Sequence, residues 1–122
     1  LVEVHAAGVN LLDAKIRNGE FKLILRYGMP LVLGHDVAGV VVKLGARAKQ
    51  FKLGDEVYAR ADEFRIGSFA EFIPVKESSL ALKPTSLTMA EAASLPLVGL
   101  TAWQVWATST PLKRCGAPTF RR

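Results

Sequence analysis

The chain has 122 residues, enough for one domain and too few for two, and its balance of 50% hydrophobic to 22% charged residues is typical of a packed globular domain. The formal net charge is +5, but the last 16 residues hold four basic side chains and no acid, which leaves +1 for residues 1–106. No basic stripe interleaved with aromatics and no apolar run of ~18 residues occurs, so we expect neither nucleic-acid binding nor a membrane span.

The sequence pattern in the first half of the chain predicts two strands with one short helix between them. Residues 1–9 alternate apolar and polar side chains, as in a half-buried strand, with His5 on the polar face. Residues 10–19 predict a short helical or turn segment that ends at Gly19. The β-branched run over residues 31–45 predicts a second strand.

The second half adds three short strands and then becomes helical. A Gly-Asp turn precedes a strand over residues 56–59, and two further strands are predicted over residues 68–75 and 79–84. Thr88 and Glu91 form a capping-box pattern at the beginning of a helix that ends or kinks at Pro96. Residues 97–106 form a second helical stretch that is apolar nearly all round, so we expect it to be buried with Trp103 and Trp106 in the core.

The adjacent His35 and Asp36 raise the question of a metal site. A catalytic zinc ion needs three protein ligands, and His35 could supply one. The single thiol, Cys115, lies in the C-terminal tail, and His5 sits on a different strand. We therefore predict no metal ligands and interpret His35 as a partly buried histidine, with Asp13 and Asp36 as structural hydrogen-bond partners rather than catalytic acids.

Six motifs then point to a family. They follow one another in the order VHAAGVNLLDAKIRNG, PLVLGHDVAGVV, FKLGDEVYA, GSFAEFIPV, LALKP and EAASLPLVGLTAW. Over residues 1–106 the chain resembles the catalytic, GroES-like domain of the medium-chain dehydrogenase/reductase superfamily. It is most similar to the zinc-independent, NADPH-dependent quinone oxidoreductases. The resemblance implies a mainly β fold, a partly open β-barrel with short helices and a helical C-terminal segment.

The resemblance also implies that zinc is absent. The zinc-dependent alcohol dehydrogenases of this superfamily bind zinc through a cysteine where this chain has Asn10, and through the histidine of a Gly-His-Glu motif, where the acid here is Asp36. A further ligand would fall near Leu97 and Val98, which cannot bind zinc.

The implied reaction is hydride transfer from NADPH to a small quinone or enone-type carbonyl acceptor. Asn10 matches an asparagine near the nicotinamide and the reacting centre, so we expect it in both catalysis and cofactor binding. Thr101 matches a threonine that approaches the nicotinamide. Lys15 either stabilises negative charge on the acceptor oxygen or is a solvated surface lysine, and the sequence favours neither.

No G-x-G-x-x-G fingerprint occurs, so we expect the Rossmann domain that would bind most of NADPH to be absent. Residues 107–122 match nothing in the family, and we expect an unrelated, disordered basic tail. The single cysteine favours a reducing compartment, the cytoplasm.

Three functions stay open. The first is the catalytic-domain fragment of a quinone or enone reductase, inactive by itself. The second is a standalone GroES-like binding or assembly module, and the third is a fragment of a zinc-type alcohol dehydrogenase. Residues 97–106 normally pack against the nucleotide domain; left bare, they would form an apolar face prone to self-association, and their sequence favours the fragment.

Overall fold

The computed structural model describes residues 1–24, 27–62 and 65–109. The predicted tail over residues 107–122 lies outside these ranges, apart from its first three residues, which continue a helix.

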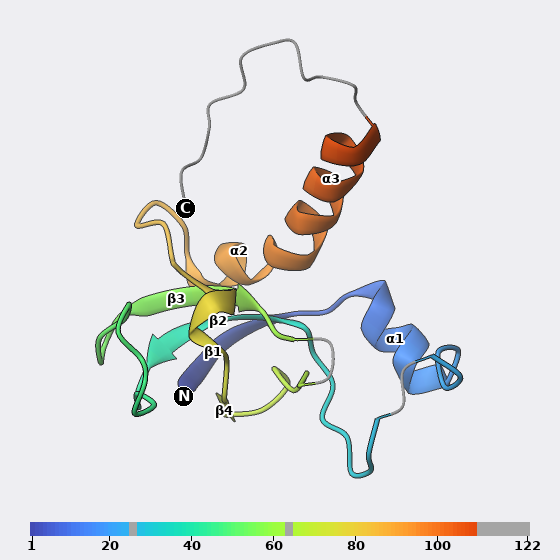
Figure 1. The fold of residues 1–122 in the computed structure, drawn as a ribbon, viewed down its shortest axis with the longest axis horizontal. Helices are drawn as coiled ribbons and strands as arrows, with labels where there is room; N and C mark the ends of the chain where they lie inside the picture. Colours follow the sequence, from blue (N-terminus) through green and yellow to red (C-terminus); the bar gives the residue numbers. More distant parts are fainter. Residues whose placement is uncertain (25–26, 63–64, 110–122) are drawn as a thin grey trace.

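The fold is built on one antiparallel sheet of five strands, shown in Figure 1. The strands are β1 (Val2–Gly8), β2 (Asp36–Val41), β3 (Glu56–Arg60), β4 (Phe72–Ile73) and β5 (Leu80–Leu82). Their order is β4-β1-β2-β3-β5, so β2 is central, and the described strands form an open sheet. The predicted mainly β class is confirmed, although β2 and β4 are shorter than the sequence pattern suggested.

The central strand β2 is buried on both faces of the sheet. Val37 and Val41 pack into the larger core, whereas Ala38 packs into a smaller one. The larger core is made of Val2, Val37, Val41, Val57, Ala59, Ala61 and Ile73. Burial on both faces explains why this segment reads as a nearly continuous apolar run rather than an alternating one.

Three α-helices complete the described chain, with a single 3-10 turn at Glu77–Ser79 before β5. Helix α1 (Leu11–Asn18) ends at Gly19, whose φ of 79° lies in the left-handed region that glycine adopts without strain. Helix α2 (Met89–Ala93) begins with the predicted capping box, in which the Glu91 N–H donates to Thr88 Oγ1 at 3.3 Å. Its Ala92 and Ala93 close the smaller core over β2.

Helix α3 (Pro96–Ser109) extends away from the sheet (Figure 1). Leu97 is half-buried, and every residue from Val98 to Thr108 is exposed. Trp103 is 61% and Trp106 50% exposed, and their rings contact each other at a centroid distance of 5.4 Å. The prediction that residues 97–106 are buried is therefore wrong. An apolar sequence indicates what a helix would bury, but the described part of the chain covers only the first turn.

No helix among the described residues is both long and apolar enough to cross a membrane.

Gly39 permits the close pairing of β1 and β2. A Cβ atom at this position would overlap the carbonyl oxygen of Glu3 on β1.

We therefore expect Gly39→Ala to lower the free energy of unfolding by about 3 kcal/mol or more, because the rigid backbone of β1 or β2 must move. Urea denaturation followed by circular dichroism measures this loss. The control is Gly45→Ala, whose Cβ would meet no atom within 4 Å and should cost no stability. Equal stability of the two variants would contradict the assigned register.

Candidate functional site

The Asp36 carboxylate joins three elements at one point. Asp36 is the first residue of β2 and is 1% exposed. Its Oδ2 accepts a hydrogen bond from Nδ2 of Asn10 at 3.0 Å, and its Oδ1 accepts one from the Leu97 backbone N–H at 3.0 Å. Asn10 is the N-cap of α1, and Leu97 lies in the first turn of α3, where N–H groups have no partner within the helix. One side chain therefore fixes both helix beginnings to the sheet.

A second buried acid, Asp13, holds the histidine. Asp13 Oδ1 lies 2.7 Å from Nδ1 of His35 and accepts a hydrogen bond from the Gly34 N–H at 3.2 Å. Its Oδ2 accepts from the Asn10 N–H at 2.9 Å. Since a carboxylate only accepts, His35 carries its proton on Nδ1. The predicted structural role of Asp13 and Asp36 as hydrogen-bond partners is what this geometry provides.

The donor set around His35 does not fit a zinc ion. His35 is fully buried, and its Nε2 has no hydrogen-bond partner within the described chain. An imidazole nitrogen of this kind is a good metal ligand, but three ligands are needed. Among residues 1–24, 27–62 and 65–109, no three His, Cys, Asp or Glu side chains lie close enough to hold a metal ion. His35 therefore has no partner ligands for a zinc ion among the described residues.

Beside the Asp36 junction lies a cavity of about 350 Å³. Its lining residues come from α1, the end of β3 and α3, and they are Leu12, Arg60, Leu97, Leu100, Thr101 and Gln104. Thr101 Oγ1 donates to the Leu97 carbonyl at 2.7 Å. The hydroxyl proton is thereby used inside the helix, so towards a ligand the Thr101 oxygen can act only as an acceptor.

The predicted site residues are only partly brought together. Asn10 and Thr101 lie on the two helices that meet at Asp36, although Asn10 itself does not line the cavity. Lys15 is half-buried on α1, forms an ion pair with Glu20 at 3.8 Å, and does not line the cavity either. Sequence reasoning missed Arg60, which does. Arg60 is brought to the cavity by the pairing of β2 with β3, which places it opposite Asp36. No local sequence motif reveals this pairing.

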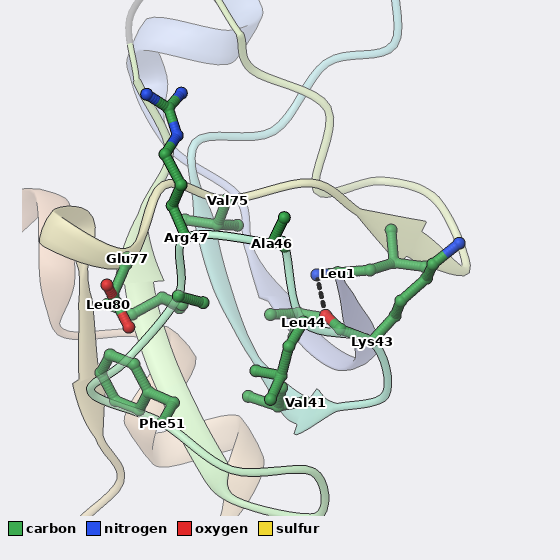
Figure 2. Close-up of a pocket in the computed structure, with 13 residues that line it drawn as sticks. Leu1, Val41, Lys43, Leu44, Ala46, Arg47, Phe51, Val75, Glu77 and Leu80 are labelled. Carbon is green, nitrogen blue, oxygen red and sulfur yellow. Dashed lines mark hydrogen bonds between the residues drawn. The ribbon is translucent and has the colours of Figure 1, made fainter.

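A larger cavity, of about 500 Å³, lies at the opposite ends of β1 and β2, where Leu1 and Val41 are (Figure 2). None of the predicted site residues lines it. Figure 2 shows apolar side chains such as Val41 and Phe51 on its wall, while the Arg47 guanidinium extends away from them. The cavity beside Asp36 is therefore the candidate site.

Burial determines the ionisation of Asp36. Removal from water raises the pKa of Asp36 above its ordinary value, and the hydrogen bonds from Asn10 and Leu97 oppose this shift without cancelling it. The folded state consequently binds this proton more tightly than the unfolded chain. The stabilisation from this group is complete below the unfolded pKa and is lost as pH rises through the folded pKa.

Two substitutions of Asp36 test this junction. At neutral pH, Asp36→Ala should lower the free energy of unfolding by roughly 2–4 kcal/mol, because it leaves Asn10 Nδ2 and the Leu97 N–H unpaired. Asp36→Asn should lower the free energy of unfolding by less. It should also abolish the extra stability at acid pH that comes from the raised pKa of Asp36. Urea denaturation at a series of pH values from acid to neutral measures both effects.

Asp62 provides a control of opposite sign. Its hydrogen bond with Lys76 lowers the pKa of Asp62, so its stabilisation is present above the unfolded pKa and is lost as pH falls through the folded pKa. Asp62→Asn should therefore remove a stabilisation that the wild type has at neutral pH and loses in acid.

An Asp36→Ala variant that is as stable as the wild type would contradict the role of the Asp36 junction.

Comparisons with known proteins agree with this architecture. A family model described as the alcohol dehydrogenase GroES-like domain matches residues 1–85. The NADPH-dependent alkenal/one oxidoreductase, chloroplastic, of Arabidopsis thaliana is 48% identical over 108 residues, covering 84% of this chain and 28% of the relative.

Solved structures show the same likeness. An alcohol dehydrogenase superfamily protein from Novosphingobium aromaticivorans is 42% identical, with a TM-score of 0.78, over 84% of this chain and 32% of its own. A quinone oxidoreductase from Escherichia coli, solved in complex with NADPH, is 28% identical, also with a TM-score of 0.78, over 90% of this chain and 32% of its own.

The chain thus spans about a third or less of the length of these three proteins. The matched residues include all five strands, α1, and both acids that organise the site. The chain belongs to the alcohol dehydrogenase GroES-like domain family, within the medium-chain dehydrogenase/reductase superfamily.

Proposed function

We propose that this chain is the acceptor-side part of a zinc-independent, NADPH-dependent oxidoreductase that reduces a quinone or an enone-type carbonyl compound. The observation that carries the proposal is the Asp36 junction, which holds Asn10 and the beginning of α3 beside a small cavity. The similarity to an alkenal/one oxidoreductase and to a quinone oxidoreductase supports the choice of acceptor class.

Asn10 and Thr101 are proposed to orient the nicotinamide. A nicotinamide carboxamide offers both N–H donors and a carbonyl acceptor. The Thr101 oxygen can accept one such N–H, since its own proton is bound to the Leu97 carbonyl. Asp36 holds the Asn10 amide in one orientation, so binding a ligand would cost little conformational entropy at this side chain. When bound, NADPH would supply the hydride, and Asn10 and Thr101 would hold its nicotinamide ring in place.

Zinc independence rests on the donor set. Asn10 stands where the zinc enzymes of the superfamily have a cysteine, and its amide is already bound to Asp36. Soft thiolate and imidazole ligands are what zinc prefers, and the described cluster offers only His35 of that kind. Carbonyl polarisation would then depend on fixed protein groups. Lys15 stays a candidate for this role, although it is paired with Glu20.

The exposed face of α3 supports a partner domain over a standalone module. Val98, Trp103, Val105 and Trp106 are each at least half exposed, and such contiguous apolar surface on a soluble protein usually marks an interface. A nucleotide-binding domain is the occupant proposed here. Self-association of the isolated chain through residues 97–106 is the expected consequence of leaving that face bare.

A reducing compartment is also proposed, on the evidence of the single cysteine. The cytoplasm is the simplest choice, although the Arabidopsis relative is named as chloroplastic. The proposed partners are small carbonyl or quinone molecules, with no nucleic acid and no membrane.

A fusion protein tests the function. Residues 1–109 are joined in frame to the nucleotide-binding part of the Escherichia coli quinone oxidoreductase, and NADPH oxidation is followed at 340 nm with a quinone or an enone. We expect the 122-residue chain alone to be inactive and the fusion to be active. In the fusion, Asn10→Ala should lower kcat/KM by roughly tenfold or more, because a fixed polar group is lost at the reacting centre.

The same preparation tests the metal. We expect no stoichiometric zinc by elemental analysis, and no loss of fusion activity on treatment with a chelator. Arg47→Ala, an exposed position at the opposite end of the sheet from Asp36, is the control and should leave kcat/KM unchanged. A folded fusion that cannot oxidise NADPH, or one that requires zinc, would refute the proposal.

A further inference from the structure

A third cavity lies beside α1, and its wall is mainly apolar. Its volume is about 390 Å³, within the range of small-molecule sites in proteins. The apolar part of the wall comes from Ile16 of α1 and Phe21 just after it, and from Met29, Leu31 and Leu33 of the segment that leads to β2. The described residues that line it share no member with the cavity beside Asp36, so it is a separate candidate site.

Hydrogen bonds hold the two sides of this cavity together. Asp13 of α1 accepts a hydrogen bond at 3.2 Å from the N–H of Gly34, the residue directly after Leu33. The Leu33 carbonyl in turn accepts one from the Phe69 N–H at 3.0 Å. Met29 is 85% exposed, so the apolar wall can be reached from solvent. A wall that is already fixed lowers the entropic cost of binding a ligand.

Two cations, Arg17 and Lys22, also line this cavity. The Arg17 guanidinium, in the last turn of α1, donates to the neutral side chain of Asn18 at 3.4 Å. The Lys22 ammonium lies at the end of the same helix, 3.3 Å from the position that a Cβ atom on Gly19 would take. The negative end of the helix dipole favours both positive charges at this place.

No carboxylate neutralises these two charges within the described chain. Neither Arg17 nor Lys22 forms an ion pair there, and no acid is among the described residues that line the cavity. Glu20, the nearest acid in the sequence, lies 3.8 Å from the ammonium group of Lys15. The cavity therefore combines an apolar wall with two unpaired positive charges, which is complementary to a molecule with an apolar body and a negative group.

We propose that this cavity binds a small amphipathic anion, in which one carboxylate is joined to an apolar chain. The chain packs against Leu31 and Leu33, and the carboxylate faces Arg17 and Lys22. Burial of the chain supplies most of the affinity, because apolar surface is removed from water. The two cations select the anion over a neutral molecule of the same shape. This binding involves no hydride transfer, so it does not depend on the proposed function.

Methyl NMR on the 122-residue chain tests this site. The sequence has two methionines, of which Met29 lines the cavity and Met89 packs against the smaller core. With ¹³C-labelled methionine methyl groups, Met29 reports binding at the cavity and Met89 is an internal control. The probes are octanoate, the neutral octanamide of nearly the same shape, and acetate, which has the charge without the chain.

We expect octanoate to shift the Met29 signal saturably and to leave the Met89 signal unchanged. Octanamide should bind at the same place about tenfold more weakly, because two partly exposed cations each contribute a modest attraction to a carboxylate. Acetate should give no saturable shift, since it has almost no apolar surface to bury. Calorimetry with octanoate measures the same affinity independently of the methyl signals.

Four variants separate the charge from the apolar wall. Arg17→Gln and Lys22→Gln should each weaken octanoate binding about threefold and leave octanamide binding unchanged. Leu31→Ala should weaken both probes by a similar factor, of about fivefold, because part of the apolar wall is lost. Its unchanged Met89 signal would show that the variant is folded. Arg47→Gln removes an equal charge from an exposed arginine that lines a different cavity, and it should change nothing.

The proposal would be overturned if octanoate did not bind, or if octanamide bound as tightly as octanoate. Binding seen by calorimetry without a shift of Met29 would overturn it too, because the anion would then occupy another surface. So would an equal loss of octanoate affinity in Arg47→Gln and in Lys22→Gln. An inactive fusion protein would count against the proposed function and would leave these binding results readable.

Discussion

The rest of the structure depends on one buried carboxylate. Asp36 accepts hydrogen bonds from the side chain that caps α1 and from the first turn of α3, so it fixes two helices to the central strand. A buried acid is costly unless it is hydrogen-bonded, and here one donor, the Leu97 N–H, is a group that the beginning of a helix leaves unpaired in any case, while the other is the side-chain amide of Asn10. The negative charge also lies at the positive end of the α3 dipole. Asn10 and the first turn of α3, which lines the cavity, take their positions from this contact.

The two buried acids organise the site through hydrogen bonds. Asp13 is engaged by Asn10, Gly34 and His35, and Asp36 by Asn10 and Leu97. Neither carboxylate is free to transfer a proton to a ligand without breaking these bonds. The proposed chemistry accordingly relies on fixed polar groups such as the Asn10 amide, a form of catalysis in which the protein positions the reactants and the nicotinamide supplies the hydride.

Helix α3 has two different parts. Its first turn belongs to the domain, because Pro96 is buried, Leu97 is half-buried, and Asp36 binds the backbone there. From Val98 onward the helix is exposed although it is strongly apolar, and the rings of Trp103 and Trp106 contact each other. A helix that is apolar all round is stable when it is covered on all sides. The exposed residues 98–108 therefore have the apolar composition that is typical of an interface.

The sequence by itself determined the element types and several of their ends. Alternation in residues 1–9, the capping box at Thr88 and the glycine after α1 act through neighbouring residues, so local patterns predict them. It also predicted Asp13 and Asp36 as hydrogen-bond partners. Only the tertiary structure decided what those partners are, that Arg60 lies opposite Asp36, and that residues 98–108 are exposed. These features depend on strand register and on contacts between residues up to 61 positions apart, and local patterns carry no information about such distances.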